Sequence, residues 1–265
     1  MSRPVSDHGA MAHDRAPIVL LELVAGRATI TLDSQPNRNA LSRQLISELN
    51  ECLDAAAGAR AIVLRHEGPA FCAGADLKER ADASKPLDSS GMVRAIERLM
   101  DAECPTIAAV DGAVRAGGLG LMAACDLVVV ERSVTFALTE VRIGVAPAII
   151  SVPVLRRVQA ARIASAMLTG EPFDAEQALA IGLVTHVTDD VAATVDRLCD
   201  GILAGAPRAV AATKRILRDI PGRARDEAFA EMRALSDEMF RGPDAAEGMA
   251  AFAERRPPVW PEPLP

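Results

Sequence analysis

Apolar residues in the first half of the chain fall in short runs that alternate with segments of helical periodicity. Ile18–Val24 and Ala28–Leu32 are two such runs, and the Ala-Gly-Arg turn between them predicts a β-hairpin. Leucines recur at helical spacing in Ser42–Ala57, where Ser42 is well placed to cap a helix. Further strands are expected at Ala61–Leu64, Thr106–Val110, Leu127–Val130 and Thr135–Ala137, and further helices at Met92–Met100 and from the glycine-rich stretch 112–120 to about Ala124. Repeated strand–helix units predict an α/β fold whose parallel strands bind ligands at their carboxyl ends.

The second half of the chain, from Pro147 to Ala253, predicts mainly helices separated by glycine and proline. One of them, Ala224–Met239, carries an apolar stripe on a single face (Ala228, Met232, Leu235 and Met239). The stripe fits either intrachain core or a subunit interface. We therefore expect an α/β core over residues 17–205 and a helical region over 206–265. Residues 1–16 are polar, lack an apolar stretch and predict a disordered leader rather than a signal peptide.

Composition narrows the possible partners. The 265 residues include 29 Lys+Arg and 36 Asp+Glu, for a net charge of −7. An acidic chain without a basic block is a poor nucleic-acid binder, and no apolar run is long enough to span a bilayer. Five scattered cysteines without a CxxC pair predict reduced thiols in the cytoplasm. Four scattered histidines predict no metal site.

A first cluster of small residues, 68–78 (Gly-Pro-Ala-Phe-Cys-Ala-Gly-Ala-Asp-Leu-Lys), follows the strand Ala61–Leu64. Small side chains let a ligand approach the backbone and leave N–H groups free to donate. The alternative is a tight structural turn. Cys72 within it is a possible nucleophile, but no histidine pairs with it in a recognisable motif, so a buried structural thiol is the favoured interpretation.

A second cluster, 111–120 (Asp-Gly-Ala-Val-Arg-Ala-Gly-Gly-Leu-Gly), follows the strand Thr106–Val110 and opens a helix. A helix N-terminus offers unpaired N–H groups to an anion or a developing oxyanion. Gly118-x-Gly120-x-x-Ala123 also fits the looser form of the dinucleotide-binding fingerprint. The acidic residue that this fingerprint requires would be Glu140, which lies 20 residues after Gly120. The context favours the first reading, because seven residues separate Val110 from Gly118 whereas the fingerprint follows its strand directly.

Glu140 lies in a mostly apolar stretch. The ordinary alternative is a solvated surface carboxylate, or one paired with Arg142. A desolvated glutamate would instead have a raised pKa and would suit proton transfer near neutral pH.

Together these elements resemble the crotonase superfamily, the enoyl-CoA hydratase/isomerase fold. The resemblance extends in order from about Ile18 to Trp260. The motifs that carry it are Asn39-Ala40-Leu41-Ser42, Phe71-Cys72-Ala73-Gly74-Ala75-Asp76-Leu77, Ala116-Gly117-Gly118 with Cys125-Asp126, Glu140-x-x-x-Gly144-x-x-Pro147, Leu168-Thr169-Gly170 with Gly182-Leu183-Val184, and Phe252-x-x-x-Arg256-x-Pro258. It implies a crotonase-like spiral of ββα units with a helical C-terminal annex, assembled as a homotrimer or homohexamer. It also implies an acyl-CoA thioester substrate and no cofactor, since coenzyme A is part of that substrate.

The resemblance also implies roles for individual residues. The backbone N–H groups of Ala75 and Gly117 would form the oxyanion hole for the thioester carbonyl, and Glu140 would be the catalytic acid/base. A fixed donor to an enolate oxygen is worth about 3 kcal/mol. Either Lys78 or Arg38 would meet a phosphate group. The residues implied for substrate and CoA binding are Arg38, Ala40, Ala73, Gly74, Ala75, Asp76, Leu77, Lys78, Gly117 and Gly120.

Gly120 departs from the family pattern. Two-glutamate hydratases of this superfamily carry their first glutamate at the position of Gly120, so only the second, Glu140, is present here. We expect a hydratase that uses Glu140, acting in fatty or branched acid degradation. A Δ3,Δ2-enoyl-CoA isomerase, which needs one base, and a non-catalytic acyl-CoA binding protein are the alternatives. If the missing acid limits hydration, Gly120→Glu should raise it. The run from Glu140 to Ser151 is similar to hydratases of branched enoyl-CoAs, such as methylglutaconyl-CoA-type enzymes.

Overall fold

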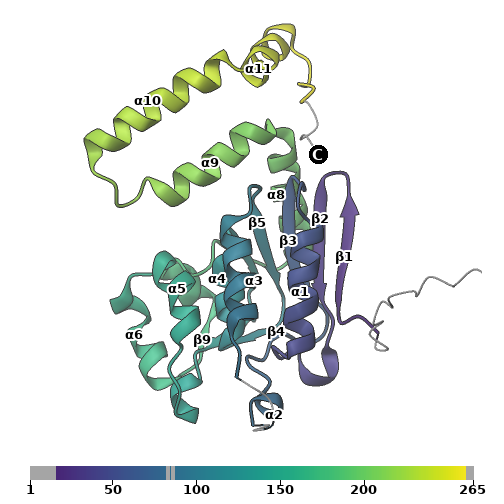
Figure 1. The fold of residues 1–265 in the computed structure, drawn as a ribbon, viewed down its shortest axis with the longest axis vertical. Helices are drawn as coiled ribbons and strands as arrows, with labels where there is room; N and C mark the ends of the chain where they lie inside the picture. Colours follow the sequence, from purple (N-terminus) through teal and green to yellow (C-terminus); the bar gives the residue numbers. More distant parts are fainter. Residues whose placement is uncertain (1–15, 82–83, 85–86, 261–265) are drawn as a thin grey trace, which may run out of the picture.

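Two sheets form the centre of the computed structural model, which describes residues 16–81, 84 and 87–260 (Figure 1). The larger sheet has six strands in the order β1-β2-β3-β5-β7-β10. Only β1 and β2 pair antiparallel, as the predicted hairpin, and every later pair is parallel. The bounds are β1 Val19–Val24, β2 Arg27–Leu32, β3 Ala61–His66, β5 Thr106–Val110, β7 Leu127–Glu131 and β10 His186–Thr188.

The smaller sheet has the order β4-β6-β8-β9. Its strands are β4 Ala70–Cys72, β6 Ala113–Arg115, β8 Thr135–Ala137 and β9 Phe173–Asp174. Along the chain, β3, β5 and β7 enter the large sheet, and each is followed by a strand of the small sheet and then by helix. This succession is the expected spiral of ββα units, so the predicted fold class is confirmed.

Helices cover both faces of the large sheet. Helix α1, capped by Ser42 as expected, packs with α3 on one face, whereas α8 packs against β3, β5 and β7 on the other. Helix α4 is apolar, and all its residues from Gly118 to Ala124 are buried. The helices are α1 Arg43–Ala55, α2 Leu77–Arg80, α3 Ser90–Asp101, α4 Gly117–Ala124, α5 Ala148–Arg157, α6 Ala160–Thr169, α7 Ala175–Ala180, α8 Val191–Ala204, α9 Pro207–Asp219, α10 Arg225–Arg241 and α11 Pro243–Glu254, with short 3-10 turns at η1 Gln35–Asn37 and η2 Glu140–Ile143.

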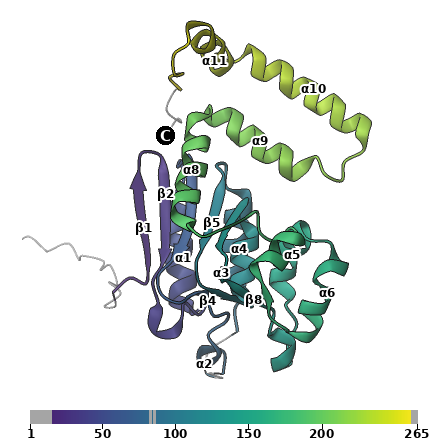
Figure 2. The ribbon, with the colours of Figure 1, turned by 180° about the vertical axis from the view of Figure 1, so that it is seen from behind.

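Helices α9, α10 and α11 lie at one end of the molecule, and α2 lies at the opposite end (Figures 1 and 2). No residue of α10 is fully buried. The four residues of its predicted stripe are only half-buried, while Phe229 and Phe240 are exposed. The stripe is thus the least exposed face of α10, and both interpretations of it, intrachain core and subunit interface, stay predictions. The predicted leader lies outside the described residues, apart from Ala16.

Four short strands are not predicted by the sequence pattern. β4 and β6 fall within the two clusters of small residues, and β9 and β10 have two and three residues. Segments this short show no measurable periodicity, and each becomes a strand only because a neighbouring strand supplies its hydrogen-bond partners. None of the helices in the described part of the chain is long and apolar enough to cross a membrane.

Candidate functional site

The first cluster of small residues is held against the segment that precedes α1. The Ala73 amide donates to the Arg38 carbonyl at 3.0 Å, and the Leu41 amide donates to the Gly74 carbonyl at 2.8 Å. Arg38 itself has a positive φ of 57° and an exposed side chain. The expected neighbours Arg38, Ala40 and 73–75 therefore come together in the fold.

The second cluster meets the first at Ala116. Its amide donates to the carbonyl of Ala137 at 2.9 Å, and its φ of 47° with ψ of −117° lies outside the regions that alanine prefers. A Cβ on Gly74 would lie 2.9 Å from the Cβ of Ala116, and one on Gly117 would clash with Leu41. Strained backbone of this kind is concentrated at functional sites. Only glycine fits at these two points of close approach.

Two backbone donors remain available at this junction. Within the part of the chain that the structure describes, the amides of Ala75 and Gly117 donate to no protein acceptor. The Gly117 amide is also the first of α4, where helix geometry leaves N–H groups unsatisfied and the dipole is positive. The arrangement can stabilise negative charge on an oxygen placed between them.

Glu140 follows β8 by three residues and begins the turn η2. Its side chain is half-buried, and its Oε2 atom has no hydrogen-bond partner among the described residues. Burial raises the pKa of this carboxyl group, and hydrogen bonding to its own backbone opposes the rise. Arg142 turns away and donates from Nε to the Thr169 carbonyl at 3.0 Å. The alternative of a carboxylate paired with Arg142 is therefore wrong.

Gly120 is enclosed by the side chain of Ile150 from α5. A Cβ built on Gly120 would lie 2.5 Å from Ile150 Cγ2 and 2.9 Å from Ile150 Cβ. Both residues are buried. The place where the side chain of a second acid would begin is thus filled by an apolar side chain.

The remaining predicted residues, Asp76, Leu77 and Lys78, lie at the start of α2. Asp76 caps α2, accepting from the amides of Lys78 at 3.0 Å and Glu79 at 3.2 Å. The side chains of Leu77 and Lys78 are exposed. Both side chains are therefore accessible to solvent, and their part in binding a ligand stays a prediction.

Cys72 is not a nucleophile in this structure. Its side chain is fully buried, its Sγ atom accepts from the Gly74 amide at 3.3 Å, and burial raises the pKa of the thiol to about 12. A protonated buried thiol is unreactive, so the structural interpretation holds. No group of residues in the described ranges could hold a metal ion.

Asn39 has a structural role that the sequence pattern does not reveal. Its Oδ1 atom accepts from the Ser34 amide at 2.6 Å, and its Nδ2 atom donates to the carbonyls of Glu67 and Ala70 at 3.0 and 2.8 Å. Asn39 is fully buried and has a φ of 54°. It ties the segment before α1 to the start of β4, and the only sequence signal is its place in the Asn39-Ala40-Leu41-Ser42 motif.

Comparison with known proteins decides the family. The sequence profile of the enoyl-CoA hydratase/isomerase family matches residues 22–263. The chain belongs to this family. A Thermus thermophilus protein that carries enoyl-CoA hydratase in its name is 35% identical over 243 residues, covering 87% of this chain and 96% of that protein. The carnitinyl-CoA dehydratase of Citrobacter koseri is 33% identical over 245 residues, covering 87% and 93%.

Solved structures of the family share the fold. The crystal structure of an enoyl-CoA hydratase from Shewanella pealeana superimposes with a TM-score of 0.86 at 28% identity, covering 92% of this chain and 96% of that one. The resemblance to the crotonase superfamily drawn from the sequence motifs is thereby confirmed.

Proposed function

We propose that this chain is an enoyl-CoA hydratase that adds water to the C2=C3 bond of an enoyl-CoA thioester. The observation that carries the proposal is the half-buried Glu140 carboxyl, whose Oε2 atom has no hydrogen-bond partner in the described part of the chain. Its position shortly after β8, beside the strand that leads to Ala116 and Gly117, supports a role next to the two free amides. Family membership and the names of the relatives agree with this chemistry.

The proposed reaction uses one carboxylate twice. Glu140 takes a proton from water as the water oxygen bonds to C3, and the C2=C3 electron pair moves to give an enolate. The amides of Ala75 and Gly117 donate to the enolate oxygen. Protonated Glu140 then gives its proton to C2, which completes the addition of one water and restores the carboxylate. A raised pKa suits this double role, because the group must both take and give a proton near neutral pH.

The substrate carries its own coenzyme A, and we expect no further cofactor. The segment from Ala73 to Lys78, with Arg38, Ala40, Gly117 and Gly120, lines the proposed path of the CoA thioester. The exposed cations of Lys78 and Arg38 are the candidates to meet CoA phosphates. The acyl group is expected to come from fatty or branched acid degradation.

Isomerisation of a 3-enoyl-CoA to the 2-enoyl-CoA is the second candidate. The closed position at Gly120 favours it, because moving a proton between C2 and C4 needs only one base whereas hydration must also hold a water. A non-catalytic acyl-CoA binding protein would retain the free amides but turn over neither substrate.

The test follows purified wild-type protein and its Glu140→Gln variant with crotonyl-CoA and with a 3-enoyl-CoA, by absorbance of the conjugated thioester and by product mass. Loss of conjugation with gain of one water supports the hydratase, and gain of conjugation without water establishes the isomerase. We expect Glu140→Gln to lower turnover by about 10²- to 10⁴-fold while CoA esters still bind. Wild-type hydration by this variant would contradict the assignment of Glu140.

We also propose that the chain assembles as a homotrimer or homohexamer in the cytoplasm. The exposed phenylalanines of the C-terminal helices, Phe229, Phe240 and Phe252, support assembly, because soluble chains seldom expose such apolar surface without a partner. Five unpaired cysteines support a reducing compartment. Sedimentation velocity is expected to give a mass of three or six chains, and a stable monomer would contradict the assembly.

A further inference from the structure

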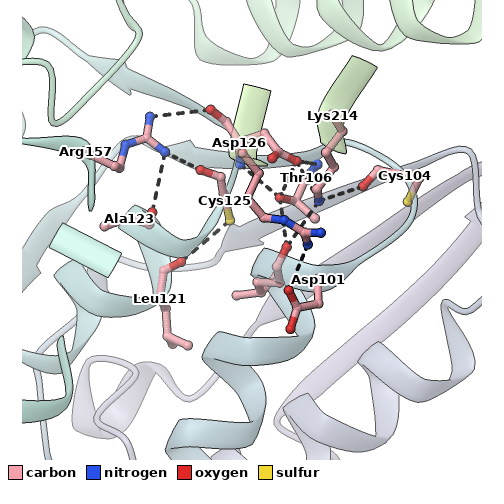
Figure 3. A network of polar contacts seen from close by, with 11 residues as sticks. Asp101, Cys104, Thr106, Leu121, Ala123, Cys125, Asp126, Arg157 and Lys214 are labelled. Atoms are coloured by element: carbon pink, nitrogen blue, oxygen red, sulfur yellow. Dashed lines mark hydrogen bonds and ion pairs between the residues drawn. The ribbon is translucent and has the colours of Figure 1, made fainter. Parts of the chain in front are cut away.

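The carboxyl end of α4 is enclosed by two cations from distant parts of the chain (Figure 3). Helix α4 carries the Gly117 amide at its first residue, and its last carbonyls have no partner inside the helix. Arg157, the last residue of α5, donates to the carbonyls of Ala123 at 3.5 Å, Cys125 and Asp126 at 3.4 Å. A guanidinium at this end also complements the negative pole of the helix dipole.

The second cation is Lys214 from α9. Its side chain is 6% exposed, and its Nζ atom lies 2.9 Å from Asp126 Oδ2. Nζ also donates to the carbonyls of Cys104 at 3.0 Å and Leu99 at 3.4 Å, so its three donors have three acceptors. Helix α9 is thereby bound to Asp126, the residue that directly follows the C-cap of α4.

Asp126 is fixed from a third direction by β5. Its Oδ2 atom accepts from the Thr106 amide at 2.7 Å and from the Thr106 hydroxyl at 3.0 Å. The Asp126 amide donates to the Thr106 hydroxyl oxygen at 3.0 Å. The end of α4 is therefore tied to the large sheet, to α5 and to α9.

We propose that Arg157 and Lys214 are positioning residues that set the location of the Gly117 amide by clamping the opposite end of α4. This inference rests on the proposed oxyanion function of that amide. An eight-residue helix is a rod about 12 Å long, so a shift at its carboxyl end reaches its first N–H. Misplacement of a catalytic group by 1 Å can cost about a hundredfold in rate, which makes the clamp matter for catalysis as well as for stability.

The alternative is that the clamp only stabilises the fold. A probe of the oxyanion hole separates the two. Acetoacetyl-CoA is a 3-ketoacyl thioester whose enolate absorbs in the near ultraviolet, and donors fixed at the thioester oxygen increase the enolate fraction of the bound molecule. This signal needs no turnover and no Glu140 chemistry. Measured well below the melting temperature, it does not change when a variant is merely less stable.

The experiment compares Arg157→Met, Arg157→Lys and Lys214→Met with Arg162→Met as a matched control on the surface of α6. We expect Arg157→Met to lower kcat about ten- to a hundredfold with little change in KM, and to weaken the enolate band in parallel. Arg157→Lys should recover part of both, Lys214→Met should show a smaller fall, and Arg162→Met should match wild type.

Folded Arg157 and Lys214 variants with wild-type kcat and a wild-type enolate band would overturn the inference, whatever their melting temperatures. If Arg157→Met does not fold, Arg157→Lys decides by the same two readouts. The outcome is distinguishable from failure of the proposed function. If the proposed function is wrong, the wild-type protein itself will neither turn over enoyl-CoA nor give the enolate band.

Discussion

The two sides of the proposed reaction centre are held in place by different means. On the oxyanion side the donors are backbone amides, and close packing sets their position: Gly74 lies against Ala116, Gly117 against Leu41 and Gly120 against Ile150. On the acid/base side a single side chain, Glu140, projects from a four-residue turn, and its Oε2 atom has no partner among the residues that the structure describes. The first side has no room for one extra methyl group, whereas the second side keeps a polar atom unsatisfied.

The difference bears on how each side would gain its proposed chemistry. A backbone donor is useful only when its position is fixed, so the oxyanion side depends on packing from β6, α4 and α5. A carboxyl group becomes a proton carrier near neutral pH when it is desolvated, so the acid/base side depends on an absent partner. Substitutions on the oxyanion side should therefore destabilise the protein by overpacking. Substitutions on the acid/base side should instead act by changing the protonation of the site.

The largest expected effect on stability is at Gly120. The sequence alone suggests that Gly120→Glu would restore a second acid, but its Cβ would lie 2.5 Å from Ile150 Cγ2. We expect the variant to lose about 1–3 kcal/mol of stability and to gain no hydration activity. The double variant Gly120→Glu, Ile150→Ala makes space for the new side chain and should recover stability. Melting temperature and crotonyl-CoA hydration measure both.

Gly120→Ala is the matched control for this prediction, because it adds the clashing carbon without a charge. It should lose stability in the same direction and recover with Ile150→Ala. A single Gly120→Glu variant that is as stable as wild type and hydrates faster would show that the oxyanion side tolerates a side chain, and the contrast between the two sides would fail.

A smaller effect is expected in the pH dependence of stability at Glu140. Burial raises the pKa of the Glu140 carboxyl group in the folded state above its ordinary value of 4.5. Below that pH the group is neutral in both the folded and the unfolded chain, so it does not lower the free energy of unfolding. As the pH rises through the raised pKa, the folded protein must carry a half-buried charge and loses stability relative to the unfolded chain. Glu140→Gln lacks that charge. Its melting temperature should exceed that of wild type at pH values above the raised pKa and converge with it near pH 4.

Glu131→Gln is the control of opposite sign. Hydrogen bonds from the side chain and amide of Ser133 lower the pKa of Glu131, so its charged form favours the fold and its replacement should not raise the melting temperature at pH 7. A Glu140→Gln variant that is less stable than wild type at pH 7 would mean that the carboxylate has a stabilising partner, and the described difference between the two sides would be wrong.

Much of this protein follows from local sequence. Alternating apolar runs and helical periodicities predicted the hairpin, α1, α3, β5, β7 and β8, because each buries its own apolar face whatever its neighbours are. The two clusters of small residues and Glu140 were recognisable as candidate chemistry for the same reason: close backbone approach needs glycine and alanine, and an acid in an apolar stretch is unusual.

Tertiary structure alone decided the rest. That Ile150 fills the space beside Gly120, that Arg142 turns from Glu140 to the Thr169 carbonyl, and that Arg157 and Lys214 grip the end of α4 are contacts between residues far apart in the chain. β4 and β6 exist only as neighbours in a sheet. Local pattern encodes which face a segment buries, but the identity of the partner, and hence the burial of a charge or the room for a methyl group, depends on how the segments pack.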